Sequence, residues 1–204
     1  MNIYNSSGEI IHTVFKDTLS FAPLNQINLR RAVLIKENLR WADLSDSDLH
    51  NANLDTADLR WAKMDRADLR LANLGDANLC EASLSETNLT RAYLCKTDMR
   101  GAFFHKTIMR KANMIKANMS DLDLRKVDFR WANLSEANMS RVDLRGADLR
   151  WANLRDTDFF KADLRGAYVY GANISEADLF RANLSGIITI DICPNKTNKI
   201  KVTT

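Results

Sequence analysis

The sequence predicts an all-β solenoid in which the chain turns a corner every five residues around a closed apolar interior. Three observations lead to this fold class. A large apolar residue occupies every fifth position for 33 consecutive repeats, from Leu24 to Leu184. The residue two positions earlier is Ala in 23 of them, and the residue one position earlier is Asp or Asn in 25. The consensus is Ala-(Asp/Asn)-Leu-x-x.

Neither a helix nor a flat strand can use this period. In a helix, five residues advance the leucine by about 140°, so the leucines would wind around every face. In a continuous strand an odd period sends successive leucines to opposite sides. A chain that bends at each repeat keeps Ala and Leu, two residues apart on a short strand, pointing inward. The Asp/Asn and the two variable residues then face outward, and the variable pair forms the corner.

The repeat, unbroken over about residues 20–186, resembles the pentapeptide-repeat family. The resemblance implies a right-handed quadrilateral β-helix with four repeats, or twenty residues, per coil, so that 33 repeats make about eight coils. Glu37 and Leu122 depart from the pattern at usual Ala positions. Five residues depart from it at usual Asp/Asn positions: Lys63, Tyr93, Phe103, Ile108 and Tyr168. Because a carboxylate that points into an apolar interior is costly, we expect a distorted first coil at Glu37.

The two ends carry different patterns and divide the chain into three parts. Residues 1–19 hold two apolar runs around Asn5-Ser6-Ser7-Gly8, which predicts a β-hairpin that caps the open end of the solenoid. Residues 20–186 form the β-helix, and residues 187–204 are expected to form a strand-turn-strand tail. That tail either completes the last coil or pairs with a second molecule. Members of the family often dimerise end to end, so a homodimer formed through one end of the solenoid is an alternative that the resemblance implies.

Composition argues against several classes of protein. The net charge of +3 fits neither a strongly basic nucleic-acid binder nor a strongly acidic DNA mimic. No run of apolar residues is long enough for a membrane span, and no secretory signal is visible. Cys80, Cys95 and Cys193 lack the spacing of a zinc site. We therefore expect free thiols, a cytoplasmic location and no contact with a membrane.

Residues twenty apart should stack on the outer surface in columns. Trp41 lies above Trp61 in one predicted column, and Trp131 lies above Trp151 in another. Each pair is interpreted either as cross-coil stacking, which we favour, or as an anchor for a partner. A basic column and the two tryptophan pairs make up the candidate partner surface: Trp131, Trp151, Arg110, Arg130, Arg150, Trp41 and Trp61.

The same arginines have a simpler interpretation. Asp128 and Asp148 lie two residues before Arg130 and Arg150 on the same outward side. Each could pair with its own arginine or with the arginine of the next coil, and such exposed pairs contribute about 0–1 kcal/mol each. We favour this self-neutralised surface over a binding surface for phosphate groups.

Residue patterns for catalysis are missing from the sequence. It contains no phosphate-cradling loop, no Gly-x-Ser-x-Gly motif and no dinucleotide fingerprint, and a filled rod offers no deep cavity for a small-molecule substrate. We therefore predict a non-enzymatic scaffold for protein–protein interaction, without cofactor or metal. One alternative, implied by the resemblance, is a DNA mimic that binds DNA gyrase and protects it from quinolones or toxins. Another is binding of nucleic acid or an acidic partner through the basic faces.

Overall fold

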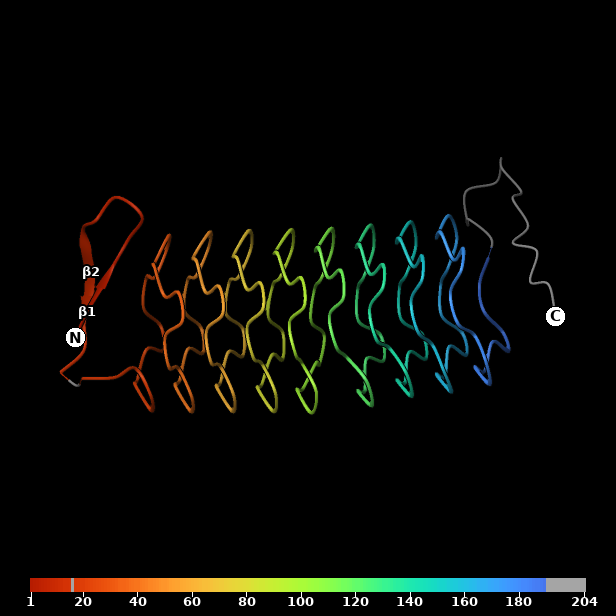
Figure 1. The fold of residues 1–204 in the computed structure, drawn as a ribbon, viewed down its shortest axis with the longest axis horizontal. Coiled ribbons are helices and arrows are strands. Elements are labelled where there is room, and N and C mark those ends of the chain that lie inside the picture. Colours follow the sequence, from red (N-terminus) through yellow and green to blue (C-terminus); the bar gives the residue numbers. More distant parts are fainter. Residues whose placement is uncertain (16, 190–204) are drawn as a thin grey trace.

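The computed structural model describes residues 1–15 and 17–189, which form a hairpin followed by a stack of coils (Figure 1). Strand β1 (Asn2–Tyr4) pairs antiparallel with β2 (Ile10–Thr13), and Asn2 lies opposite Thr13. The predicted N-terminal hairpin is therefore present. In Figure 1 the hairpin lies at one end of the stack, beside the first coil.

The coils are joined by short parallel β-bridges between residues twenty apart. The bridges begin with Pro23 and Asp43, end with Tyr168 and Ile188, and fall into four columns. In each column the chain uses the same pair of hydrogen bonds. For example, the amide of Asp43 donates to the carbonyl of Ala22 at 3.0 Å, and the amide of Leu24 donates to the carbonyl of Asp43 at 2.7 Å. One coil therefore takes twenty residues, and the chain is a repeat β-helix.

Tight turns form the corners between the strands. Every fifth residue from Phe21 to Gly186 has a positive φ, and the amide after it often donates back across the turn, as Ala22 does to the carbonyl of Leu19 at 3.0 Å. A positive φ at the third residue is the geometry of a type II turn. The Asp or Asn of the repeat braces many of these corners. Asp68, for example, accepts a hydrogen bond from the amide of Arg70 at 3.1 Å.

The interior is filled in layers by the two inward positions of the repeat. The central leucines, methionines and phenylalanines and the neighbouring alanines are almost all fully buried between Leu19 and Val169. Where Thr replaces Ala, its hydroxyl donates to a carbonyl of the preceding coil, as Thr157 does to Leu134 at 2.9 Å. The polar atom is thus paired inside the apolar core.

The hairpin continues the β-helix at its N-terminal end. The amide of Val33 donates to the carbonyl of Tyr4 at 2.8 Å, and the amide of Ser6 donates to the carbonyl of Arg31 at 3.0 Å. Ile3 contributes to the core and is only 1% exposed. Backbone pairing and apolar burial therefore hold the hairpin to the first coil.

The expected distortion at Glu37 is wrong. The bridge between Asn38 and Asp58 is present, and the amide of Asp58 donates to the carbonyl of Glu37 at 3.0 Å. Glu37 lies in the first coil and is only half-buried, so its carboxylate keeps contact with solvent. The cost appears in its titration instead, because partial burial raises the pKa of Glu37.

The predicted C-terminal tail falls almost entirely outside the described residues, which end at 189. Within the described part, Ile188 still pairs with Tyr168 in the regular register. Among the described residues, no helix is long and apolar enough to cross a membrane.

Candidate interaction surfaces

The basic column forms a chain of alternating charges along the rod. The Nε of Arg110 lies 2.5 Å from the Oδ2 of Asp128 in the next coil. Arg130 contacts Asp128 at 2.9 Å and Asp148 of the next coil at 3.5 Å, and Arg150 contacts Asp148 at 2.6 Å. The predicted self-neutralised surface is confirmed for these residues, because each aspartate faces at least one guanidinium group.

Asp128 shows how strongly this column favours ionised carboxylates. Burial alone would raise the pKa of Asp128, but hydrogen bonds from Arg130 and Arg110 outweigh it and hold the pKa below its usual range. The pKa of Asp68 is lowered chiefly by its hydrogen bond with Arg70. The column therefore keeps both signs of charge near neutral pH and presents no continuous basic strip.

Beside the arginines, two tryptophans form an exposed stack. The rings of Trp131 and Trp151 lie 5.2 Å apart at an interplanar angle of 9°, and Tyr170 meets Trp151 edge-on at 4.9 Å. Trp131 is 55% exposed and Trp151 is 42% exposed. The predicted cross-coil stacking is thus present, and it leaves about half of each ring accessible to a partner.

The second tryptophan pair has the same geometry at a different place. Trp41 and Trp61 stack at 5.0 Å, and Phe21 extends the stack at 6.1 Å from Trp41. The guanidinium groups of Arg40 and Arg60 lie over the Trp61 ring at 4.9 and 5.6 Å. Half a coil separates the two tryptophan columns around the rod, and several coils separate them along it. The seven candidate residues therefore form two surfaces.

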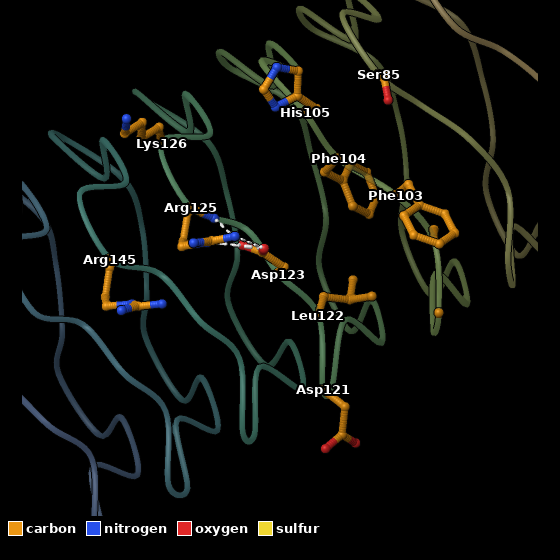
Figure 2. A pocket seen from close by; sticks show the side chains of 12 residues that line it. Ser85, Phe103, Phe104, His105, Asp121, Leu122, Asp123, Arg125, Lys126 and Arg145 are labelled. Atoms are coloured by element: carbon orange, nitrogen blue, oxygen red, sulfur yellow. Dashed lines mark hydrogen bonds and ion pairs between the residues drawn. The ribbon is translucent and has the colours of Figure 1, made fainter.

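The structure has a groove between two coils, where the sequence predicted a filled rod. The bridges are regular in every column except one. In that column Phe103 pairs with Ser83 and Asp123 pairs with Asp143, but Phe103 and Asp123 do not pair with each other. The coils spread at this point, with a wider spacing along the lower side of Figure 1 between the green and teal coils. The opening has a volume of about 660 Å³. Figure 2 shows its main lining residues: Phe103, Phe104, His105, Leu122, Arg125 and Lys126.

Two departures from the repeat coincide at this groove. Leu122 places a branched side chain at an inward position where alanine is usual, and it faces the coil that contains Phe104. Phe103 has no side-chain oxygen with which to brace the corner at His105, as Asp123 braces Arg125 at 3.1 Å. Overfilling pushes packed layers apart. Both departures are visible in the sequence, but only their adjacency in space produces the groove.

Clusters that suggest other chemistry are missing from the described part of the chain. Among the described residues, no three His, Cys, Asp or Glu side chains come close enough to hold a metal ion. Cys80 and Cys95 are free, and Cys193 lies beyond the described residues. Burial raises the pKa of the Cys80 thiol, which disfavours its thiolate.

Comparisons with known proteins place the chain in a family. The model of pentapeptide repeats matches with eight copies, spread from residue 18 to residue 186. HetL, a pentapeptide repeat protein involved in heterocyst differentiation regulation in the cyanobacterium Nostoc, is 32% identical over 82% of both chains, with a TM-score of 0.36. A trypsin-treated variant of QnrB1, a plasmid-mediated fluoroquinolone resistance protein, is 17% identical over 84% of this chain and 88% of its own, with a TM-score of 0.63. No curated protein sequence matches. The repeats matched along most of its length show that the chain belongs to the pentapeptide-repeat family.

Proposed function

We propose that the protein is a non-enzymatic, rigid scaffold that binds a protein partner. Its binding surface is formed by Trp131, Trp151, Arg110, Arg130 and Arg150, here called the Arg/Trp corner. The observation that carries the proposal is the exposed stack of Trp131 on Trp151, since exposed tryptophans held in place by neighbours are typical binding anchors. Trp41 and Trp61 form a second, smaller anchor.

Rigidity supports this function because a preorganised surface loses little entropy on binding. The four columns of bridges favour the right-handed quadrilateral form with about eight coils. In that form most outward Asp and Asn positions, Asp128 and Asp148 among them, are fixed by backbone pairing to the coils on both sides. The guanidinium groups of Arg130 and Arg150 are already oriented by Asp128 and Asp148. The partner expected here offers flat apolar groups to the rings and hydrogen-bond acceptors to the arginines.

DNA mimicry is less well supported. The likeness to QnrB1 at 17% identity concerns the fold alone. A DNA mimic needs a surface of unpaired negative charge, whereas the carboxylates on this rod are frequently paired with arginine. A gyrase supercoiling assay distinguishes the two functions, and we expect neither inhibition nor quinolone protection at micromolar protein.

Direct binding of nucleic acid is disfavoured for the same reason. Because the arginine columns are paired with aspartate, we expect the protein to bind heparin only weakly and to elute at a low salt concentration. Tight retention with a steep dependence on salt would instead favour a nucleic-acid ligand.

Affinity capture tests the scaffold proposal. The tagged protein is compared with a Trp131→Ala/Trp151→Ala variant and with a matched Phe160→Ala/Phe180→Ala control. The control removes another stacked pair, whose rings are 6.0 Å apart. We expect the tryptophan variant to lose a partner that wild type and control retain, with a decrease in affinity of at least tenfold. Equal capture by all three proteins would exclude the Arg/Trp corner as the binding surface.

A further inference from the structure

We propose that the groove between Phe103 and Asp123, here called the ladder break, binds an extended acidic peptide segment of a partner protein. This site is separate from the Arg/Trp corner. The proposal rests on three features of the groove: unpaired backbone groups on its two edges, an exposed aromatic ring and an excess of positive charge at one end.

The first feature is the backbone of the two facing strands. In the preceding coil the amide of Leu84 donates to the carbonyl of Phe103 at 2.9 Å, and the amide of Phe103 donates to the carbonyl of Ala82 at 2.9 Å. Among the described residues, the corresponding bonds between residues 102–104 and Asp123 are missing. Two strand edges therefore face each other with free donors and acceptors. An extended peptide backbone offers the alternating donors and acceptors that can pair with both edges.

The second feature is the apolar wall. Phe103 is 63% exposed, although most residues at its position in the repeat are Asp or Asn. Phe104 and Leu122 line the opening behind it and are 6% and 3% exposed. An extended peptide alternates its side chains, so one apolar side chain can face this wall while the next points to solvent.

The third feature is the distribution of charge. Arg125, Lys126 and Arg145 lie at one end of the groove, and Asp121 lies at the other (Figure 2). Arg125 and Arg145 are each paired with their own aspartate at 2.5 and 2.6 Å. Lys126 has no ion pair among the described residues. An acidic side chain of the peptide is therefore expected at the Lys126 end.

A phage library of random heptapeptides, selected in parallel against wild type and three variants, tests this proposal. Leu122→Ala removes the side chain that overfills the interior, so the strands can close on each other. Lys126→Glu reverses the unpaired charge without touching the core, and Lys36→Glu is the matched control on another corner. We expect wild type and Lys36→Glu to enrich proline-poor peptides with acidic residues. Their affinity should fall at least tenfold for Leu122→Ala and about fivefold for Lys126→Glu.

The binding mode has its own readout. A selected peptide should slow hydrogen exchange of the Phe104 amide and leave that of Leu84 unchanged. No enrichment over Leu122→Ala, enrichment of basic peptides, or equal affinity for Lys126→Glu would overturn the proposal. If wild type forms a dimer that Leu122→Ala dissolves, the groove binds a second copy and the proposal is wrong. None of these outcomes bears on the Arg/Trp corner.

Discussion

At the scale of single residues, the corner position imposes a backbone conformation that side chains rarely adopt. Every fifth residue has a positive φ, and glycine occupies only a few of these positions, such as Gly166 at +66° and Gly171 at +68°. A left-handed residue with a side chain costs roughly 1–2 kcal/mol. The strain is tolerated because backbone hydrogen bonds to the neighbouring coils hold most of the corners in place, as the amide of Trp131 donates to the carbonyl of Arg150.

Gly166 isolates this conformational cost. A Cβ atom placed there has no heavy atom within 4 Å, so Gly166→Ala should destabilise only through its backbone, by about 1 kcal/mol. At Gly171, a Cβ atom would clash with the ring of Trp151. Gly171→Ala should therefore destabilise more and also alter tryptophan fluorescence. Urea unfolding measures both changes, and equal losses for the two variants would contradict this explanation.

Replacing the half-buried Glu37 by an uncharged residue should stabilise the protein. Burial raises the pKa of Glu37 in the folded protein above the ordinary 4.5, so the folded state binds this proton more tightly than the unfolded state does. The free energy of unfolding should therefore decrease as pH rises through this pKa. Glu37→Gln should be more stable than wild type at pH 7, by at most about 1 kcal/mol because the side chain is half-exposed. The difference should vanish near pH 3. Thermal unfolding at both pH values is the measurement, and a destabilised variant at pH 7 would refute it.

At the scale of elements, short parallel strands hold the rod together, and their one interruption among the described residues lies at Phe103 and Asp123. We expect the Phe104 amide to exchange at least tenfold faster than the Leu84 amide. The Leu84 amide donates to the carbonyl of Phe103 in the next coil at 2.9 Å, whereas the Phe104 amide lacks the corresponding bond. Both side chains are buried, so the difference reports the missing hydrogen bond. Hydrogen exchange by NMR measures it, and equal protection would mean that the two strands pair in solution.

The regular part of the fold could be predicted from the sequence because one repeat specifies it. The five-residue period already placed Trp131 over Trp151, since residues twenty apart must meet, and it placed Asp148 beside its own Arg150. The second contact of Asp148 is with Arg130 of the preceding coil, whereas the expected cross-coil pairing was with the next coil. The ladder break could not be predicted in this way. Val127 and Val142 also replace alanine, yet the bridges beside them are intact. Whether a larger residue separates the coils depends on its neighbours in the adjacent layer, such as Phe104.

At the scale of the whole molecule, pairing of opposite charges determines how the rod responds to acid. Arginine hydrogen bonds lower the pKa of Asp58, Asp68, Asp98 and Asp128 below the ordinary 3.8. Their contribution is complete above that value and is lost as pH falls through the folded pKa values. We expect protonation of these four carboxylates below about pH 4 to lower the free energy of unfolding by roughly 1–3 kcal/mol in total, after allowance for solvent screening. Urea unfolding between pH 6 and pH 2 tests this, and constant stability over that range would contradict it.

The register of twenty residues determines every surface described above, and a designed disulfide tests it most directly. Asn138 and Asp158 are bridged neighbours, a placement within the reach of a disulfide. In a background where the three native cysteines are serine, Asn138→Cys/Asp158→Cys should oxidise fully to an intramolecular disulfide. The control pair Asn138→Cys/Asn153→Cys, fifteen residues apart on different columns, should remain reduced. Efficient oxidation of the control with little in the first pair would show that the coils do not repeat every twenty residues.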